Sequence, residues 1–230
     1  MRCLFFVITI LITQLISAQS EQGAVVFEGN TNVSIGSLQL TELKNTFTYQ
    51  SELPNNSFKS TSLSLNAGYF IINNLSINLS LKFNYDIINY NNNIYSDGEY
   101  SYLSYGVFSR YYINNLWLWV QAGYQIGRIS DYSLLDNLNY SWSSNYIAPL
   151  AIEHSGIENI PINTFLLDFG FSFFINPNIS IDPTIGTTRT TYTIKNIAYI
   201  NQYEENTDKL DLVLASFQFK LSIGIIFHLH

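Results

Sequence analysis

The 230-residue sequence has little charge and almost no cysteine. Charged residues make up 12% of the chain, about half of the roughly 25% that globular proteins use. The 10 Lys and Arg residues are outnumbered by 17 Asp and Glu residues, for a formal net charge of −7. This balance argues against nucleic-acid binding, because phosphate recognition needs a basic surface. The composition also argues against disorder, because 47% of the residues are hydrophobic.

The only cysteine, Cys3, lies in the first 18 residues. The rest of the chain can therefore form no disulfide, thiolate metal site or cysteine nucleophile. Residues 1–18 combine a basic Arg2, an apolar stretch over 4–12 and the small residues Ser17 and Ala18. This pattern predicts a signal peptide, and the stretch is shorter than the ~20 residues of a spanning helix. We therefore expect a signal peptide over 1–18 and one domain over 19–230.

Long hydrophobic runs are also missing after Ala18, which excludes membrane-spanning helices. The chain shows strict alternation instead. Over 75–87, Leu and Ile and two aromatic residues alternate with Ser, Asn, Lys and Asp. Such a period of two puts one face of a strand against an apolar environment and the other against a polar one. This run is about twice the usual 5–6 residues of a strand and is long enough for the ~9–11 tilted residues that cross a bilayer.

Eight segments follow this pattern, and their connections alternate between short and long. The expected strands are 25–35, 61–71, 75–87, 103–113, 116–126, 165–175, 179–192 and 217–229. The short turns are 73–74, 114–115 and 176–178, and the long loops are 37–59, 88–100, 130–162 and 195–211. Short turns at one end and long loops at the other are typical of transmembrane barrels.

The bilayer requires every backbone N–H and C=O group to be paired within the protein, so only helices or a closed barrel can cross it. With helices excluded, the sequence predicts an all-β fold. We expect an eight-stranded antiparallel up-and-down transmembrane β-barrel with short periplasmic turns and long extracellular loops.

Nearly all strand charges fall on positions that face the interior of this barrel. Lys82, Arg110 and Lys220 are expected to find partners among Glu28, Asp168 and Asp182. The predicted lumen charge network contains Glu28, Lys82, Asp86, Arg110, Asp168, Asp182 and Lys220. These charges indicate either an ion path or a polar plug, and the narrow interior of eight strands favours the plug.

Aromatic residues are expected at the two membrane borders. Tyr69, Tyr111 and Phe173 would lie on the turn side, and Tyr85, Tyr105 and Tyr124 toward the loops. The loops themselves are acidic, which indicates either a surface that binds cations or partners or simple solvation. The longest loop, 130–162, is the candidate recognition element, because binding is usually carried by surface loops. Its candidate residues are Tyr140, Trp142, Tyr146, Glu153 and His154.

Two patterns contain the residue types of a catalytic or metal site without the arrangement that such a site needs. The run Glu153-His154-Ser155 contains the residue types of a hydrolase triad, but triads assemble from distant positions rather than adjacent ones. His228 and His230 share one strand face, yet a terminal pair lacks a third metal ligand. We therefore expect no catalytic residue, metal or cofactor.

Three stretches of the sequence resemble the OmpA/OmpX-like small barrels of Gram-negative outer membranes. They are 66–85, 106–127 and 169–186, each an aromatic strand end, an Asn-containing turn and an alternating strand. The resemblance spans about 23–230. The chain departs from it in ending on His230, whereas the family usually ends on an aromatic residue.

The resemblance implies a monomer exported to the outer membrane, in contact with outer-membrane lipid, with an extracellular ligand as a further partner. Periplasmic chaperones and the barrel-assembly machinery would be its partners during biogenesis. The expected function is a structural, adhesive or surface-binding one without catalysis. The alternatives are a narrow pore or conduit for small hydrophobic molecules, and a lipid-modifying enzyme.

Overall fold

A computed structural model describes residues 21–44, 56–90, 98–113, 117–129, 160–200 and 207–229. The expected signal peptide, the turn 114–115 and most of the loop 130–162 lie outside these ranges. The strands are β1 (Val25–Lys44), β2 (Asn56–Ile72), β3 (Leu75–Tyr90), β4 (Gly98–Tyr112), β5 (Leu118–Ile129), β6 (Ile160–Phe171), β7 (Phe173–Asn176), β8 (Ile179–Ile200) and β9 (Thr207–Leu229). No helix in the described ranges is long and apolar enough to span a membrane.

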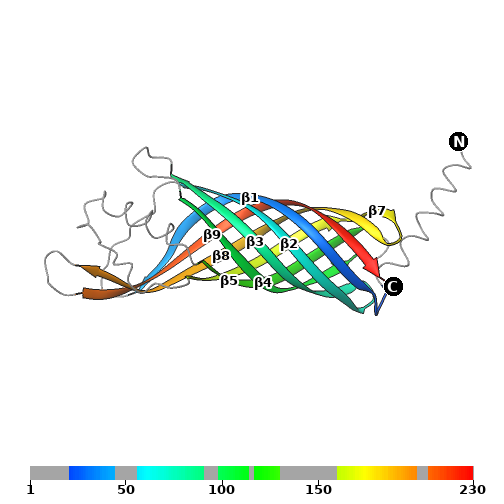
Figure 1. The fold of residues 1–230 in the computed structure, drawn as a ribbon, viewed down its shortest axis with the longest axis horizontal. Helices are drawn as coiled ribbons and strands as arrows, with labels where there is room; N and C mark the ends of the chain where they lie inside the picture. The colour runs from blue at the N-terminus through cyan, green and yellow to red at the C-terminus, as the bar shows by residue number, and fades with distance from the viewer. Residues whose placement is uncertain are drawn as a thin grey trace, which may run out of the picture.

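The strands form one closed antiparallel barrel (Figure 1). Each strand from β1 to β6 pairs with its neighbour in sequence, β9 pairs with both β1 and β8, and the β6–β8 pairing closes the wall. The ladder that starts at Ile226 and passes once around the barrel returns to β9 at Ser216, ten residues away. This stagger accompanies the strand tilt that closure requires. The predicted eight-stranded fold is confirmed.

The predicted strand 165–175 is interrupted, which gives nine strands in an eight-membered wall. β6 pairs with β8 as far as Gly170 opposite Thr184, and β7 resumes the same register with Phe173 opposite Ile181. That register places Pro183 opposite the interruption. Proline has no N–H to donate to the ladder, so the pairing breaks there. β7 therefore continues β6 and is not a ninth member of the wall.

Two tight turns connect strands at the turn end of the barrel, where β1 begins and β9 ends. Asn74 has a φ of 69°, a left-handed conformation that asparagine tolerates better than most residues. In the second turn, Asn178 donates its N–H to Oδ1 of Asn176 at 2.9 Å. Both segments were predicted as turns from their asparagines.

The strands at the other end, the loop end, run further than predicted. The expected loop 195–211 retains only 201–206 between β8 and β9, and β1 continues to Lys44 within the expected loop 37–59. Bulges between Leu40 and Glu42 and between Ile194 and Ile197 shift the register there. Because a bulge changes which side chains share a face, alternation stops at these points although the backbone pairing continues.

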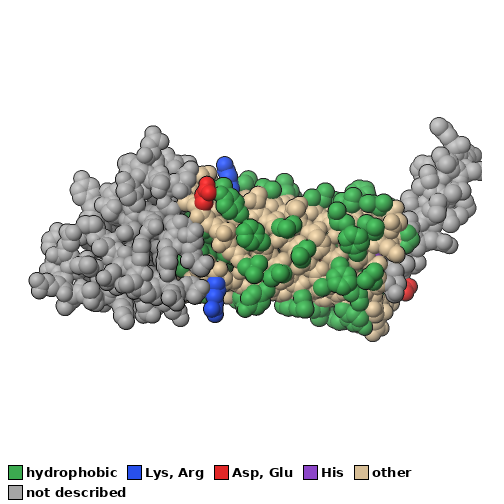
Figure 2. All heavy atoms as spheres, viewed as in Figure 1, with side chains coloured by type: hydrophobic (Ala, Val, Ile, Leu, Met, Phe, Trp, Pro, Cys, Tyr) green, Lys and Arg blue, Asp and Glu red, His purple; other side chains and the backbone are tan. Residues whose placement is uncertain are grey.

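Large apolar side chains are exposed on the outside of the barrel, and on the face seen in Figure 2 they form a band of groups between the turn end and the loop end. The six aromatic residues expected at the borders are all exposed: Tyr69, Tyr85, Tyr105, Tyr111, Tyr124 and Phe173. At the turn end, Trp117 packs edge-on against Phe171 with ring centroids 5.5 Å apart, next to the β6–β7 interruption. An apolar surface of this extent on a soluble protein would be an aggregation liability, whereas lipid is its natural solvent.

Candidate functional site: the barrel lumen

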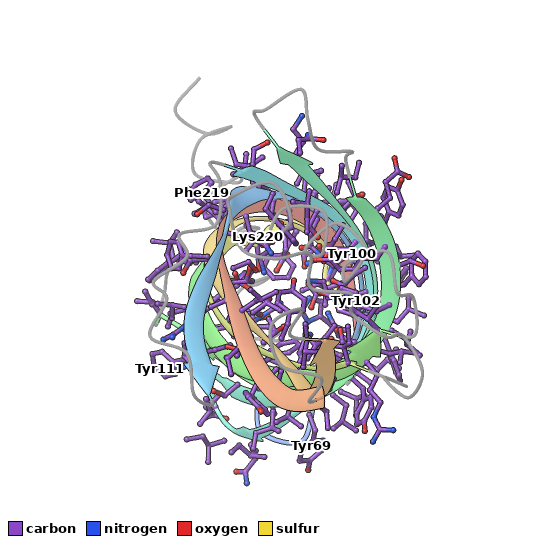
Figure 3. The ribbon with its side chains drawn as sticks, turned by 90° about the vertical axis from the view of Figure 1, so that its left-hand side faces the viewer. Tyr69, Tyr100, Tyr102, Tyr111, Phe219 and Lys220 are labelled. Carbon is purple, nitrogen blue, oxygen red and sulfur yellow. The ribbon has the colours of Figure 1, made fainter. Side chains whose placement is uncertain are left out.

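The interior of the barrel is filled by side chains. Viewed along the axis, Tyr100, Tyr102 and Lys220 lie inside the wall, while Tyr69, Tyr111 and Phe219 point outward (Figure 3). Inward glycines make room for bulky neighbours. A Cβ on Gly170 would lie 2.0 Å from the Trp119 ring, and one on Gly123 would lie 2.4 Å from the Cβ of Phe108. The lumen is therefore filled by large side chains that occupy the space left free by glycines.

Arg110, on β4, is the hub of the turn-side half of the lumen. Its guanidinium donates to Oε2 of Glu28 at 2.9 Å and to Oε1 of Gln121 at 2.9 Å, and it lies 3.5 Å from Oδ2 of Asp182. The guanidinium also stacks 4.0 Å from the centre of the Trp119 ring. Only 3% of Arg110 is exposed. A planar donor fork suits several partners at once, which a lysine could not match.

Asp182, on β8, completes this half of the network. Its carboxylate accepts hydrogen bonds from Nε1 of Trp119 at 3.0 Å, from Ser172 at 2.8 Å and from Ser180 at 2.8 Å. Ser172 lies in the β6–β7 interruption, so the break in the wall also supplies a hydroxyl to the lumen. The charge of Asp182 is thus compensated by Arg110 and by three donors.

Glu28 holds the β1 side of the same network. Besides the contact with Arg110, it accepts hydrogen bonds from Asn30 at 3.2 Å and from Asn66 at 3.1 Å. Both amides therefore turn their nitrogens toward the carboxylate. Their carbonyl oxygens are buried without a hydrogen-bond donor in the described part of the protein.

A second ion pair lies on the loop side of the Arg110–Glu28 pair, and Gln121 links the two. Lys220 on β9 contacts Asp168 on β6 at 2.6 Å. Gln121 donates to the same Asp168 oxygen at 2.8 Å while accepting from Arg110. A single amide side chain therefore connects the two groups of charges.

Lys82 and Asp86, both on β3, are held less tightly. Lys82 is half-buried and makes no ion pair with any described residue. Asp86 is fully buried, and the hydroxyl groups of Ser60, Tyr100 and Tyr102 face its carboxylate. None of them closes a hydrogen bond of standard geometry onto either oxygen within the described ranges. The structure thus brings Arg110 and Lys220 to the expected carboxylates, but not Lys82.

Clusters of buried apolar and aromatic side chains lie at both ends of the lumen, and the sequence analysis did not predict them. The turn-end cluster contains Ala24, Val26, Phe70, Tyr112, Trp119 and Ile226. The loop-end cluster contains Phe58, Ile88, Tyr100, Ile129, Ile162, Tyr192 and Leu214, all buried inward-facing residues. Continuing the alternation of each strand toward the loops would have found the second cluster, because Phe58, Ile88 and Tyr100 keep the inward phase.

His228, one of the two terminal histidines of the sequence analysis, lies on the inward face of β9. It is buried, and its Nε2 lies 3.2 Å from the hydroxyl of Ser180, while its ring packs 5.4 Å from that of Phe174. No group of three His, Cys, Asp or Glu residues suited to a metal occurs in the described part of the chain. His230 and the candidate loop residues Tyr140, Trp142, Tyr146, Glu153 and His154 lie outside the described residues.

This arrangement is a lumen filled by charged and polar side chains, not an open channel. Four carboxylates and three cations face inward, and Arg110 and Lys220 pair with three of the carboxylates across the barrel. Side chains from β1, β4, β6, β8 and β9 are joined through these contacts. Removing one partner of such a buried pair is costly, so the network ties opposite walls together.

Comparison with solved structures places this fold among bacterial outer-membrane barrels. The outer membrane protein OprG from Pseudomonas aeruginosa matches with a TM-score of 0.53 and 10% sequence identity, over 93% of this chain and 99% of that one. Neisserial surface protein A matches with a TM-score of 0.45 and 14% identity, over 90% of this chain and 99% of that one. No protein-family model matches the chain, and no curated protein matches it in sequence. The chain has the fold of small outer-membrane barrels.

Proposed function

We propose that the protein is an integral barrel of the Gram-negative outer membrane, in the manner of OmpA/OmpX-like proteins. In this proposal the turns face the periplasm and the loops face outward. The barrel acts without catalysis, as a rigid support for a structural, adhesive or surface-binding role of its loop end.

The observation that carries the proposal is the separation of side chains by the wall. Outward positions of the central strands hold exposed Leu, Ile, Val and aromatic residues, and inward positions hold the charges. An alternation of this kind is stable when lipid surrounds the barrel, since a lipid-facing charge would cost roughly 2–4 kcal/mol at mid-bilayer.

The filled lumen favours a supporting role over conduction. An eight-stranded barrel leaves just enough interior for side chains. Here that interior holds the Arg110 and Lys220 networks, with buried apolar clusters at both ends. A continuous polar path for ions would have to displace Phe70 or Trp119 at one end and Phe58 or Tyr192 at the other.

Membrane fractionation combined with gel mobility tests the proposal. Folded barrels resist SDS until heated, so unboiled protein from outer-membrane fractions is expected to migrate differently from boiled protein. Recovery in the soluble fraction with identical mobility would overturn it.

Planar-bilayer recordings separate a filled barrel from a pore. The purified barrel is expected to give no discrete conductance. Steps of conductance that change when Asp168 is replaced by Asn would assign the lumen to ion passage instead.

A further inference from the structure

The outward-facing cations of the described barrel lie on three strands of the wall, no two of which are adjacent. They are Lys59 on β2, Arg128 on β5 and Arg189 on β8, all exposed. The remaining Lys and Arg side chains that the structure describes, Lys82, Arg110 and Lys220, face the lumen. Figure 2 shows the Lys and Arg side chains of this view at the loop-end border of the apolar band.

These three cations stand at one height on the barrel. Each is ten residues along its own strand from an outward side chain near the turn end: Tyr69, Leu118 and Ile179, respectively. Ten residues extend roughly 33 Å along a strand, or about 25 Å along the axis at a tilt of about 40°. That distance is the usual height of the apolar band of such barrels. We call Lys59, Arg128 and Arg189 the basic ring.

The neighbours of the basic ring are apolar. Arg189 lies between Phe165 and Phe217 across the ladder. Lys59 lies between Ile35 and Ile87. None of the three cations forms an ion pair with any residue that the structure describes. Long basic side chains at such positions run along apolar surface and carry their charge to the interface.

The other border of the band differs. Tyr69, Tyr111 and Phe173 are exposed there, and no Lys or Arg occurs among the outward side chains described at that end. The chain as a whole is acidic, with a net charge of −7. A plane of cations on one border of an acidic protein therefore does not follow from its overall composition.

We propose that the basic ring binds phosphate groups of anionic lipid headgroups in the leaflet at the loop end. This inference rests on the proposed function, because it requires lipid around the apolar band. Lys and Arg near an anionic membrane surface are attracted to it, and the guanidinium forks of Arg128 and Arg189 match phosphate oxygens. The ring would thereby fix both the depth and the direction of the barrel in the membrane.

The test compares the full-length barrel with the variant K59Q/R128Q/R189Q. Both are reconstituted into phosphatidylcholine vesicles with and without diphosphoryl lipid A, and the lipid that remains bound after extraction is quantified by mass spectrometry. The wild type is expected to retain lipid A preferentially. Binding should fall about fivefold for each cation removed, which corresponds to about 1 kcal/mol per cation near the surface.

Two controls make the result decisive. The variant K59R/R128K/R189K keeps the charges and is expected to retain lipid A. Glu99→Gln removes a carboxylate from the same end but no cation, and it is also expected to retain lipid A. Equal retention of lipid A by the wild type and by the neutral variant would overturn the proposal that the basic ring binds lipid phosphates. The proposed function would survive that result provided that the protein remains heat-modifiable and fractionates with the outer membrane.

Discussion

The two halves of the lumen are filled in different ways. On the turn side, Arg110 and Asp182 each contact several partners. Glu28 also accepts hydrogen bonds from the side-chain amides of Asn30 and Asn66. On the loop side, Lys82 makes no described ion pair and both oxygens of Asp86 lack hydrogen bonds of standard geometry. Glu28, Arg110 and Asp182 are therefore each held by several contacts, whereas Lys82 and Asp86 are held loosely, and only the Lys220–Asp168 pair is tight on the loop side. The difference indicates that stability comes mainly from the turn-side network.

Replacing Arg110 by Leu is expected to have the largest effect on that network. The change leaves Glu28 and Asp182 buried without their cation, which typically costs 3–5 kcal/mol. Urea unfolding of the barrel in lipid vesicles measures the free energy of unfolding. Arg110→Lys should lose less, because it keeps the charge but cannot serve all the partners. A loss below about 1 kcal/mol for Arg110→Leu would contradict the importance of this half.

The same chemical change in both halves sharpens the comparison. Asp182→Asn replaces one accepting oxygen by an amide nitrogen and removes the negative charge that faces Arg110, so a loss of about 2–3 kcal/mol is expected. Asp86→Asn removes a carboxylate with no standard hydrogen bond, and its effect should stay within about 1 kcal/mol. Unfolding midpoints of the two variants, measured side by side, decide the matter. Equal losses would remove the distinction between the halves.

Replacing inward glycines by alanine is expected to give the smallest difference in stability between the two halves of the lumen. A Cβ on Gly170 would meet the Trp119 ring at 2.0 Å, whereas one on Gly127, in the loop-side half, would meet the Leu103 carbonyl at 2.8 Å. Gly170→Ala should cost about 1–3 kcal/mol through overpacking, and Gly127→Ala less. Outward-facing Gly29, with no atom within 4 Å of an added Cβ, provides the control. A larger loss for Gly29→Ala than for Gly170→Ala would show that packing against Trp119 is unimportant.

Alternation in the sequence was enough to predict the wall. Strict period two fixes both the strand and its lipid-facing side, so the inward phase of Glu28, Arg110 and Asp182 could be read directly. The interruption at Pro183 could not, because it depends on which residue of β6 lies opposite the proline. Partner choice within the lumen was equally hidden. That Arg110 reaches Glu28 and Asp182 follows from the stagger of the whole barrel, which no single strand encodes.

The strand ends beyond the membrane were underestimated for a related reason. Outside the lipid, a strand needs only backbone pairing and no alternation. The bulges near Leu40 and Ile194 also break the phase. The long β8–β9 hairpin in Figure 1 is therefore a feature that local periodicity cannot reveal.

The apolar clusters at the two ends of the lumen have one more consequence. Mobile ions screen charges that face the solvent within about 8–10 Å at physiological salt, but screen buried pairs much less. Phe70 and Trp119 at one end and Phe58 and Tyr192 at the other separate Arg110 and Lys220 from the surrounding electrolyte. The interior of this barrel should therefore be indifferent to ionic strength, while contacts made by Lys59, Arg128 and Arg189 on its surface should weaken as salt is added.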